Sequence, residues 1–234
     1  MREVNSCRDG MREGEHEMKY PELRKQIIDA CLWLQEKELV VGTWGNISVR
    51  TEEGILVTPS RVEYGKMTPE DMVLIDRDGR ILEGHRSPTT EREVHRMIYL
   101  ARQDVNAIVH YHPKYASAMC ATDREIPAFS EEMTQLVGGS VPITPEYIRA
   151  GEHERLGAAA AKYLGEKNAV MLRNHAPVCC GKDLEEALTC CQVVEKAALC
   201  YLALRGADLE IKLIPQELIE AENRRFKYDY GHEW

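Results

Sequence analysis

Two hairpin patterns in the first third of the chain constrain its fold most strongly. The runs "NISVR" and "ILVTPS" are rich in β-forming residues and flank the polar segment "TEEG", which is typical of a hairpin turn. "MVLIDRDGRIL" repeats the pattern, with Asp78 and Gly79 as its turn dipeptide. Because a hairpin joins antiparallel neighbours, we expect a mixed or antiparallel sheet with helices packed on its faces.

Helical and strand-like segments alternate along the rest of the chain. Helical periodicity predicts helices over residues 21–39, 87–102, 113–121, 152–167, 183–204 and 215–226. Strands are predicted over residues 105–112 and 169–175, and residues 128–147 are predicted to combine a short helix, a Gly-Gly break and a strand. With 234 residues and no interior linker, residues 19–234 are expected to form one domain. Residues 1–18 are polar without a period and are expected to be a flexible N-terminal extension.

The charge and composition exclude several classes of partner. The chain carries 30 basic and 39 acidic residues, a net charge of −9, which argues against nucleic acid or an anionic membrane surface as the main partner. No run of about 18 apolar residues is present, so no transmembrane helix is expected. An anionic ligand would therefore be held by local hydrogen-bond donors.

The eight cysteines show no zinc-finger spacing, and two pairs are adjacent in sequence. Neighbouring side chains on a strand or helix point in different directions, so we interpret the cysteines as reduced, small apolar residues. The charged N-terminus has no apolar middle typical of a secretory signal. Together these features predict a cytoplasmic protein.

Two histidines end the apolar run "IVHYH". On a strand, residues i and i+2 face the same way, so His110 and His112 are expected to project together. Imidazole is the commonest protein ligand for zinc, and two imidazoles supply half of a tetrahedral site. A metal site is one interpretation; two exposed or hydrogen-bonded histidines are the other.

Further ligands are available from two other segments. His175 ends the strand-like run "AVMLRNH", and Glu91 lies at the start of a predicted helix. His95 is four residues after Glu91 on the same helical face and competes with it as a ligand. The spacing does not choose between them.

Small polar residues gather at predicted turns and helix starts in "GTWGNIS", "VTPS" and "SPTT". Backbone N–H groups at such positions, helped by hydroxyl and amide side chains, can bind a phosphate without a basic patch. The alternative is that these residues only form turns, which is their usual role.

Taken in order, "GTWGNIS", "VTPS", "SPTTEREVH", "IVHYHPKYASA", "IPA", "VMLRNHAPV" and "DLEEAL" resemble the class II aldolase/adducin family, from about Leu23 to Leu204. The resemblance implies a three-layer α/β/α fold around a mostly antiparallel central sheet. It also implies a homotetramer with active sites at subunit interfaces.

The resemblance assigns roles position by position. It makes His110, His112 and His175 metal ligands and Glu91 the metal-associated glutamate, which favours Glu91 over His95. The implied ion is Zn²⁺, although the sequence does not distinguish it from Mn²⁺ or Co²⁺. The positions that match the family's phosphate-binding residues are Thr43, Gly45, Asn46, Ser60, Thr89 and Thr90.

The chain departs from the family pattern at several positions. Arg61 stands where glycine is usual after "TPS", and its guanidinium is expected to reinforce phosphate binding or to recognise a carboxylate or a different sugar tail. Ala176 replaces the common glycine after the third histidine. The loop "IPAFSEEM" carries Glu131 and Glu132 where a catalytic tyrosine is common.

The C-terminal "KYDYGHEW" is similar to the ending of the family's epimerase branch, which makes Tyr230, and second Tyr228, a candidate acid or base from a neighbouring subunit. The implied reaction is a metal-dependent, reversible aldol cleavage of a phosphorylated ketose, such as L-fuculose 1-phosphate or a related deoxy-ketose phosphate. It yields dihydroxyacetone phosphate and an aldehyde. Glu91 is the expected base, with Tyr230 or Glu131 as the second acid or base. Alternatives are a sugar-phosphate 4-epimerase, a decarboxylase or a dehydratase on the same site, or a non-catalytic adducin-like assembly domain.

Overall fold

The computed structural model describes residues 18–149 and 151–229 and confirms the predicted antiparallel sheet. The sheet has seven strands in the order β4-β3-β2-β1-β5-β7-β6, and each neighbouring pair runs antiparallel. The two predicted hairpins form β1–β2 and β3–β4. The strands are β1 (Gly45–Arg50), β2 (Ile55–Val57), β3 (Val73–Ile75), β4 (Ile81–Glu83), β5 (Ala107–Tyr111), β6 (Ala169–Met171) and β7 (Pro177–Gly181).

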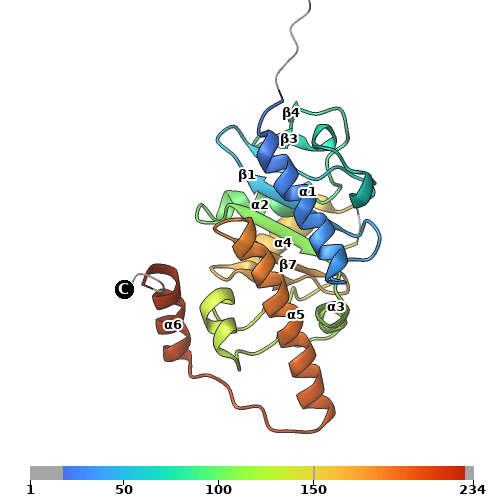
Figure 1. Ribbon diagram of the computed structural model, residues 1–234. Helices are drawn as coiled ribbons and strands as arrows, with labels where there is room; N and C mark the ends of the chain where they lie inside the picture. The colour runs from blue at the N-terminus through green and yellow to red at the C-terminus, as the bar shows by residue number, and fades with distance from the viewer. Residues whose placement is uncertain (1–17, 150, 230–234) are drawn as a thin grey trace, which may run out of the picture.

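Helices cover both faces of the sheet and make the three-layer α/β/α fold that was expected. One hydrophobic core lies between the sheet and α1, α3 and α5, and a second lies between the sheet and α2 and α4. Figure 1 shows α1 and α5 crossing the near face of the sheet. The helices are α1 (Pro21–Glu36), α2 (Arg92–Ala101), α3 (Lys114–Cys120), α4 (His153–Leu164), α5 (Leu184–Gly206) and α6 (Gln216–Tyr228), with short helical turns η1 (Tyr64–Lys66), η2 (Pro69–Asp71) and η3 (Met133–Val137).

The alternation of side chains along the strands divides the two cores. On β5, Val109 and Tyr111 pack in the core with α1 and α5, whereas Ile108 packs in the core with α2 and α4. Burying one such aliphatic side chain contributes about 1.5–3 kcal/mol, so the facing of the strand is strongly fixed. By the same period, His110 and His112 belong to the α2 side of the sheet.

Three predictions about the C-terminal half need correction. The strand β7 was not predicted, because "PVCCG" is short and its cysteines gave no β signal. The strand expected within residues 128–147 is reduced to isolated bridges, Ile126 with Val141 and Ile143 with Met171. The strand expected over residues 169–175 ends at Met171, which places His175 on the turn between β6 and β7.

By length and composition alone, the helix α5 is long and apolar enough to cross a membrane. Its buried side chains pack in the hydrophobic core between the sheet and α1, α3 and α5. The cysteines in the described part of the chain are free, and all of them except Cys200 are buried. The predicted extension of residues 1–18 falls outside the described residues except for Met18.

Candidate metal centre

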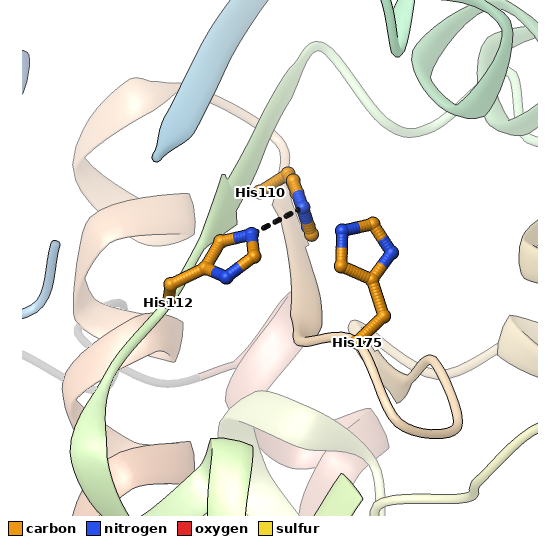
Figure 2. Close-up of side chains that lie close together, drawn as sticks. All are labelled: His110, His112 and His175. Atoms are coloured by element: carbon orange, nitrogen blue, oxygen red, sulfur yellow. Dashed lines mark hydrogen bonds between the residues drawn. The ribbon is translucent and has the colours of Figure 1, made fainter. Parts of the chain in front are cut away.

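Three histidine rings converge at one end of the sheet. His110 is on β5, His112 follows it by two residues, and His175 lies on the β6–β7 turn beside them. Each ring offers one nitrogen, and these nitrogens all lie within 4.8 Å of one another. The ring centroids are 4.8–5.1 Å apart, and Figure 2 shows the three rings pointing toward a common centre.

The turn that carries His175 is held by backbone hydrogen bonds. The N–H of His175 donates to the carbonyl of Leu172 (3.0 Å), and Asn174 sits in the left-handed region with φ 53° while its N–H donates to Cys120. Asparagine tolerates this conformation better than most residues. Ala176 is fully buried and is not in the left-handed region, so alanine replaces the family's usual glycine there without backbone strain.

The tautomer of His110 is fixed by the strand next to it. Its Nδ1 lies 3.0 Å from the carbonyl oxygen of Pro177, so Nδ1 is the donor and the lone pair of the neutral ring is on Nε2. That Nε2 lies 3.1 Å from Nε2 of His112 and 3.2 Å from Oε2 of Glu91. Three electron-rich atoms thus meet around one point, an arrangement that requires a proton or a metal cation between them.

Glu91 closes the cluster from the N-cap position just before α2. Its Oε1 lies 3.1 Å from Nε2 of His175, and its Oε2 faces His110. Although burial opposes ionisation, the two histidines hold the pKa of the Glu91 carboxyl far below its ordinary value. Burial opposes the charged form of His110 too, but Glu91 raises its pKa above the ordinary value.

His112 differs electrostatically from its two partners. Burial, followed by the charges of His110 and His175, lowers the pKa of His112 to about 3, so its ring is neutral at physiological pH. A neutral imidazole is the form that coordinates a metal.

The donor set fits a transition-metal ion. Two nitrogens that each bind one ion at roughly 2.0–2.1 Å approach each other to roughly 3.0–3.4 Å, and the His110 and His112 nitrogens are already 3.1 Å apart. The hydrogen bond from His110 Nδ1 to a backbone carbonyl is the usual way in which a protein orients a ligating histidine. His110, His112 and His175 could therefore hold a metal ion, with Glu91 in position as a fourth group.

His95, the competing ligand, is placed elsewhere. It is fully buried under the cluster and bonds to Asn46 and Ser48 through its two nitrogens, so neither nitrogen is free for a metal. Burial, followed by the charge of His110, lowers the pKa of His95 to about 3. Asn46 in turn donates from Nδ2 to Oε2 of Glu91 (2.9 Å).

Trp44 belongs to this site and was missed by the sequence analysis. Its ring centroid lies 5.5 Å from that of His112 in an edge-on contact, although 66% of its surface is exposed. The cause is the strand register: Gly45 pairs with Tyr111, so Trp44 falls opposite His112 at the end of the β1–β5 ladder. A tryptophan two residues before the predicted strand "NISVR" was the available signal in the sequence.

Gly45 is a glycine for reasons of packing. A Cβ atom there would lie 2.9 Å from Cγ1 of Val40 and 3.1 Å from the carbonyl oxygen of His110. The Tyr64 hydroxyl donates to the carbonyl oxygen of Gly45 (2.6 Å), which fixes the entry to β1 from the other side. Close backbone approach therefore explains this residue without a ligand.

The candidate phosphate-binding residues fall into two groups. Thr43, Gly45 and Asn46 lie at the start of β1, and the Asn46 amide is occupied by His95 and Glu91. Ser60, Arg61 and Thr90 line a cavity of about 670 Å³, which we name the outer cavity. Thr89 lies between the two groups, buried, with its N–H donating to the carbonyl of Thr58.

The outer cavity is basic although the chain is acidic overall. Its charged lining includes Arg61, Arg86 and Arg92, with His85 beside them, and none of the described residues that line it is acidic. Arg86 is paired with Asp71 at 2.7 Å, whereas Arg61 makes no hydrogen bond or ion pair within the described part of the chain. The cavity suits an oxyanion.

Arg61 adopts a backbone conformation that favours glycine. Its φ of 61° lies in the left-handed region, which a non-glycine residue occupies at a cost of about 1 kcal/mol or more. Strain of this kind is typically retained where the side chain has a function. The same left-handed conformation suits the glycine that the resemblance leads one to expect at this position.

The candidates for the second acid or base are not brought to the histidines. Glu131 is exposed and accepts from Nε2 of Gln135 (3.2 Å), and Glu132 pairs with Lys196. Neither has a hydrogen bond or ion pair with the three histidines among the residues described. Tyr228 is at the exposed end of α6, and Tyr230 lies outside the described residues.

Comparison with known proteins identifies relatives over most of the chain. Residues 25–202 match the class II aldolase and adducin N-terminal domain. L-fuculose phosphate aldolase of Escherichia coli K12 is 35% identical over 214 residues, which cover 92% of this chain and 98% of that protein. 5-Deoxy-D-ribulose 1-phosphate aldolase of Bacillus thuringiensis is 34% identical over 213 residues, covering 90% and 97%.

A solved structure supports the same relationship. That of an L-fuculose 1-phosphate aldolase superposes with a TM-score of 0.85 and 29% sequence identity, covering 92% of this chain and all of the other. The family match spans residues 25–202, and the structural match covers 92% of the chain. The chain therefore belongs to the class II aldolase and adducin family.

Proposed function

We propose that this protein is a metal-dependent aldolase that reversibly cleaves a phosphorylated ketose into dihydroxyacetone phosphate and an aldehyde. The observation that carries the proposal is the convergence of three imidazole nitrogens within 4.8 Å of one another, with the Glu91 carboxylate against two of them. The printed functions of the relatives, aldolases of L-fuculose phosphate and 5-deoxyribulose phosphate, support the same class of substrate.

The proposed metal ligands are His110, His112 and His175, with Glu91 as the metal-associated carboxylate. Zn²⁺ is the ion we expect, and Mn²⁺ or Co²⁺ would suit the same donors. When bound, the cation supplies Lewis-acid stabilisation of negative charge that develops next to a carbonyl. Three neutral imidazoles suit this role because, unlike thiolate or carboxylate ligands, they add no negative charge to the ion.

The residues of the chain must handle two protons. In the cleavage direction a base removes the proton from the hydroxyl on the carbon that becomes the aldehyde. The carbon–carbon bond then breaks, and its electron pair passes to the fragment that becomes dihydroxyacetone phosphate. A proton returned to the carbon next to the carbonyl completes this product, and Glu91 is proposed to hold and deliver it.

The first proton is assigned to Tyr230, or to Glu131 as the second choice. Within one chain, the described contacts of Glu131 do not reach the histidines. We therefore propose that the second acid or base comes from a neighbouring subunit of a homotetramer, whose active sites lie at the subunit interfaces. The cytoplasmic location of such an enzyme remains a prediction from its use of cysteine.

The outer cavity is the proposed site of the substrate phosphate. Ser60 and Thr90 offer hydroxyl groups, and Arg61 offers a guanidinium that pairs with none of the described residues. Thr43, Gly45, Asn46 and Thr89 complete the set on the β1 side. The segments that carry Ser60 and Thr89 are joined by hydrogen bonds from Ser60 N to Ser87 O (2.9 Å) and from Thr89 N to Thr58 O (3.0 Å). Binding energy from a phosphate held by these joined segments can orient the reacting carbons of the substrate.

The test is a panel of ketose 1-phosphates incubated with the metal-loaded protein, with release of triose phosphate as the measurement. We expect release from at least one ketose phosphate and its loss after chelation. Conversion to an epimer without triose phosphate would support the 4-epimerase instead. A metal-loaded protein that is inert toward the whole panel would favour the adducin-like assembly role.

A further inference from the structure

His95 lies at the centre of a buried chain of hydrogen bonds that ends on Glu91. Its Nδ1 is 2.6 Å from Oγ of Ser48, and its Nε2 is 2.5 Å from Oδ1 of Asn46. Asn46 Nδ2 is 2.9 Å from Oε2 of Glu91, and the hydroxyl of Tyr99 is 3.0 Å from Oγ of Ser48. His95, Ser48 and Tyr99 are at most 2% exposed.

The direction of each bond follows from the carboxylate at its end. Asn46 Nδ2 donates to Oε2 of Glu91, so the amide presents its NH₂ group to Glu91 and its oxygen to His95. The oxygen accepts, so Nε2 of His95 carries the proton. Nδ1 then holds the lone pair and accepts from the Ser48 hydroxyl.

We propose that His95 is a positioning residue for Glu91, acting through Asn46. It holds the side-chain amide of Asn46 in the single orientation that gives Glu91 a hydrogen-bond donor. This inference rests on the proposed role of Glu91 as the proton carrier at carbon. It assigns a function to a histidine that the metal site does not use.

The position of Glu91 depends on this amide more than on its other contacts. Its remaining described side-chain partners are His110 and His175, whose nitrogens are the proposed metal ligands. When those nitrogens bind a metal ion, Asn46 is the described side chain that still donates a hydrogen bond to the Glu91 carboxylate. A flipped Asn46 would turn its oxygen toward Glu91, and two acceptors facing each other repel.

A spectroscopic test measures the direction of these hydrogen bonds without any enzymatic turnover. In the metal-loaded protein, ¹⁵N–¹H correlation of the histidine rings is expected to show His95 protonated at Nε2 and not at Nδ1. A His95 ring protonated at Nδ1 would overturn the proposal, even if the protein proved to be an active aldolase. The Nε2 tautomer would support it, even if no ketose phosphate were cleaved.

A kinetic test uses dihydroxyacetone phosphate as the probe, because exchange of its carbon-bound proton with solvent deuterium needs no aldehyde. His95→Leu removes the donor at similar volume and is expected to slow exchange by about tenfold or more, with bound metal and the half-saturating probe concentration little changed. His95→Gln restores an N–H donor and is expected to recover most of the rate. Tyr201→Phe, which is buried on α5 outside this chain of hydrogen bonds, is the control and should stay within about threefold of wild type.

Exchange at the wild-type rate in folded, metal-loaded His95→Leu would overturn the proposal. If that variant fails to fold, Ser48→Ala decides, because it removes the donor to Nδ1 and frees the ring to change tautomer. Slower exchange with full metal content supports the proposal, and an unchanged rate overturns it. Absence of exchange in the wild type would count against the proposed function, and the ring tautomer would then decide the role of His95.

Discussion

Asn46 lies directly opposite His110 in the antiparallel pairing of β1 with β5, so both side chains project from the α2 side of the sheet. On β1 the period of two then places Trp44 at the mouth of the site, Asn46 beside Glu91 and Ser48 beside His95. One face of β1 thus contacts both the histidine cluster with Glu91 and the buried His95 beneath it.

Removing a histidine of the cluster should remove the metal. His110→Ala or His112→Ala is expected to lose bound metal and triose phosphate release together, because two imidazoles bind a transition metal much more weakly than three. Metal analysis of the dialysed protein is the measurement. His153→Ala, on α4, is the control, and a His110→Ala protein that keeps its full metal content would contradict the assignment.

Replacing the carboxylate should separate metal binding from proton transfer. Glu91→Gln keeps the shape of the side chain and is expected to retain much of the metal while slowing proton exchange in dihydroxyacetone phosphate by about 100-fold or more. The exchange rate followed by NMR is compared at equal metal content. An unchanged rate would remove Glu91 as the proton carrier.

Arg61→Gly should weaken phosphate binding without destabilising the protein. Glycine relieves the left-handed φ of 61°, while the loss of a charge-assisted contact is expected to weaken binding of methyl phosphate by about tenfold or more. Methyl sulfate, with the same shape but one negative charge, should be affected less. Calorimetry gives the affinities and thermal denaturation gives the stability.

Two controls accompany this variant. Asp208→Gly relieves a similar φ of 54° on the segment after α5, and Arg80→Ala removes an arginine that is close in sequence but does not line the outer cavity. Both should bind methyl phosphate as wild type does. A lower melting temperature for Arg61→Gly would show that Arg61 has a structural role.

In the protein freed of metal by a chelator, the buried His95 should make the folding stability decrease as the pH falls. Its pKa is lowered to about 3, so the unfolded chain, with a pKa near 6.5, binds the proton more readily as the pH falls. Its contribution to stability is therefore present above about pH 6.5 and is lost progressively as the pH decreases toward 3. Urea denaturation of wild type should lose about 2 kcal/mol more between pH 7 and pH 5 than His95→Leu does. Equal losses would show that the ring is not held neutral.

Trp44 should report on the metal site. Because its ring lies 5.5 Å from that of His112, Co²⁺ is expected to quench its fluorescence on binding. Trp44→Phe should bind Co²⁺ but lose most of the change in emission. Quenching of the same size in that variant would assign the signal to Trp33 or Trp234.

Much of this architecture could be predicted from periodicity and turn chemistry. The "TEEG" and Asp78-Gly79 turns predicted the two hairpins, and the i, i+2 spacing placed His110 and His112 on one face. The choice of His175 and Glu91 came from resemblance, because no local rule relates residues 91, 112 and 175. Those contacts depend on the order of strands in the sheet.

The remaining features depend on tertiary register and could not be predicted. Glu91 and His95 meet opposite ends of the Asn46 side-chain amide, a placement that depends on cross-strand pairing and on the orientation of that amide. The strand β7 is stabilised by β5 and β6 on either side of it rather than by its own residues. The assignments of Tyr230 and of the flexible extension stay predictions.

The central place of β5 has a consequence for how this enzyme can fail. A slip of one residue against β1 or β7 would turn Val109 and Tyr111 out of their core and send His110 and His112 to the opposite face. The pairing of β5 that buries its core residues is thus the same pairing that brings His110 and His112 to the site. Mispaired chains should be inert and prone to aggregate rather than altered in specificity.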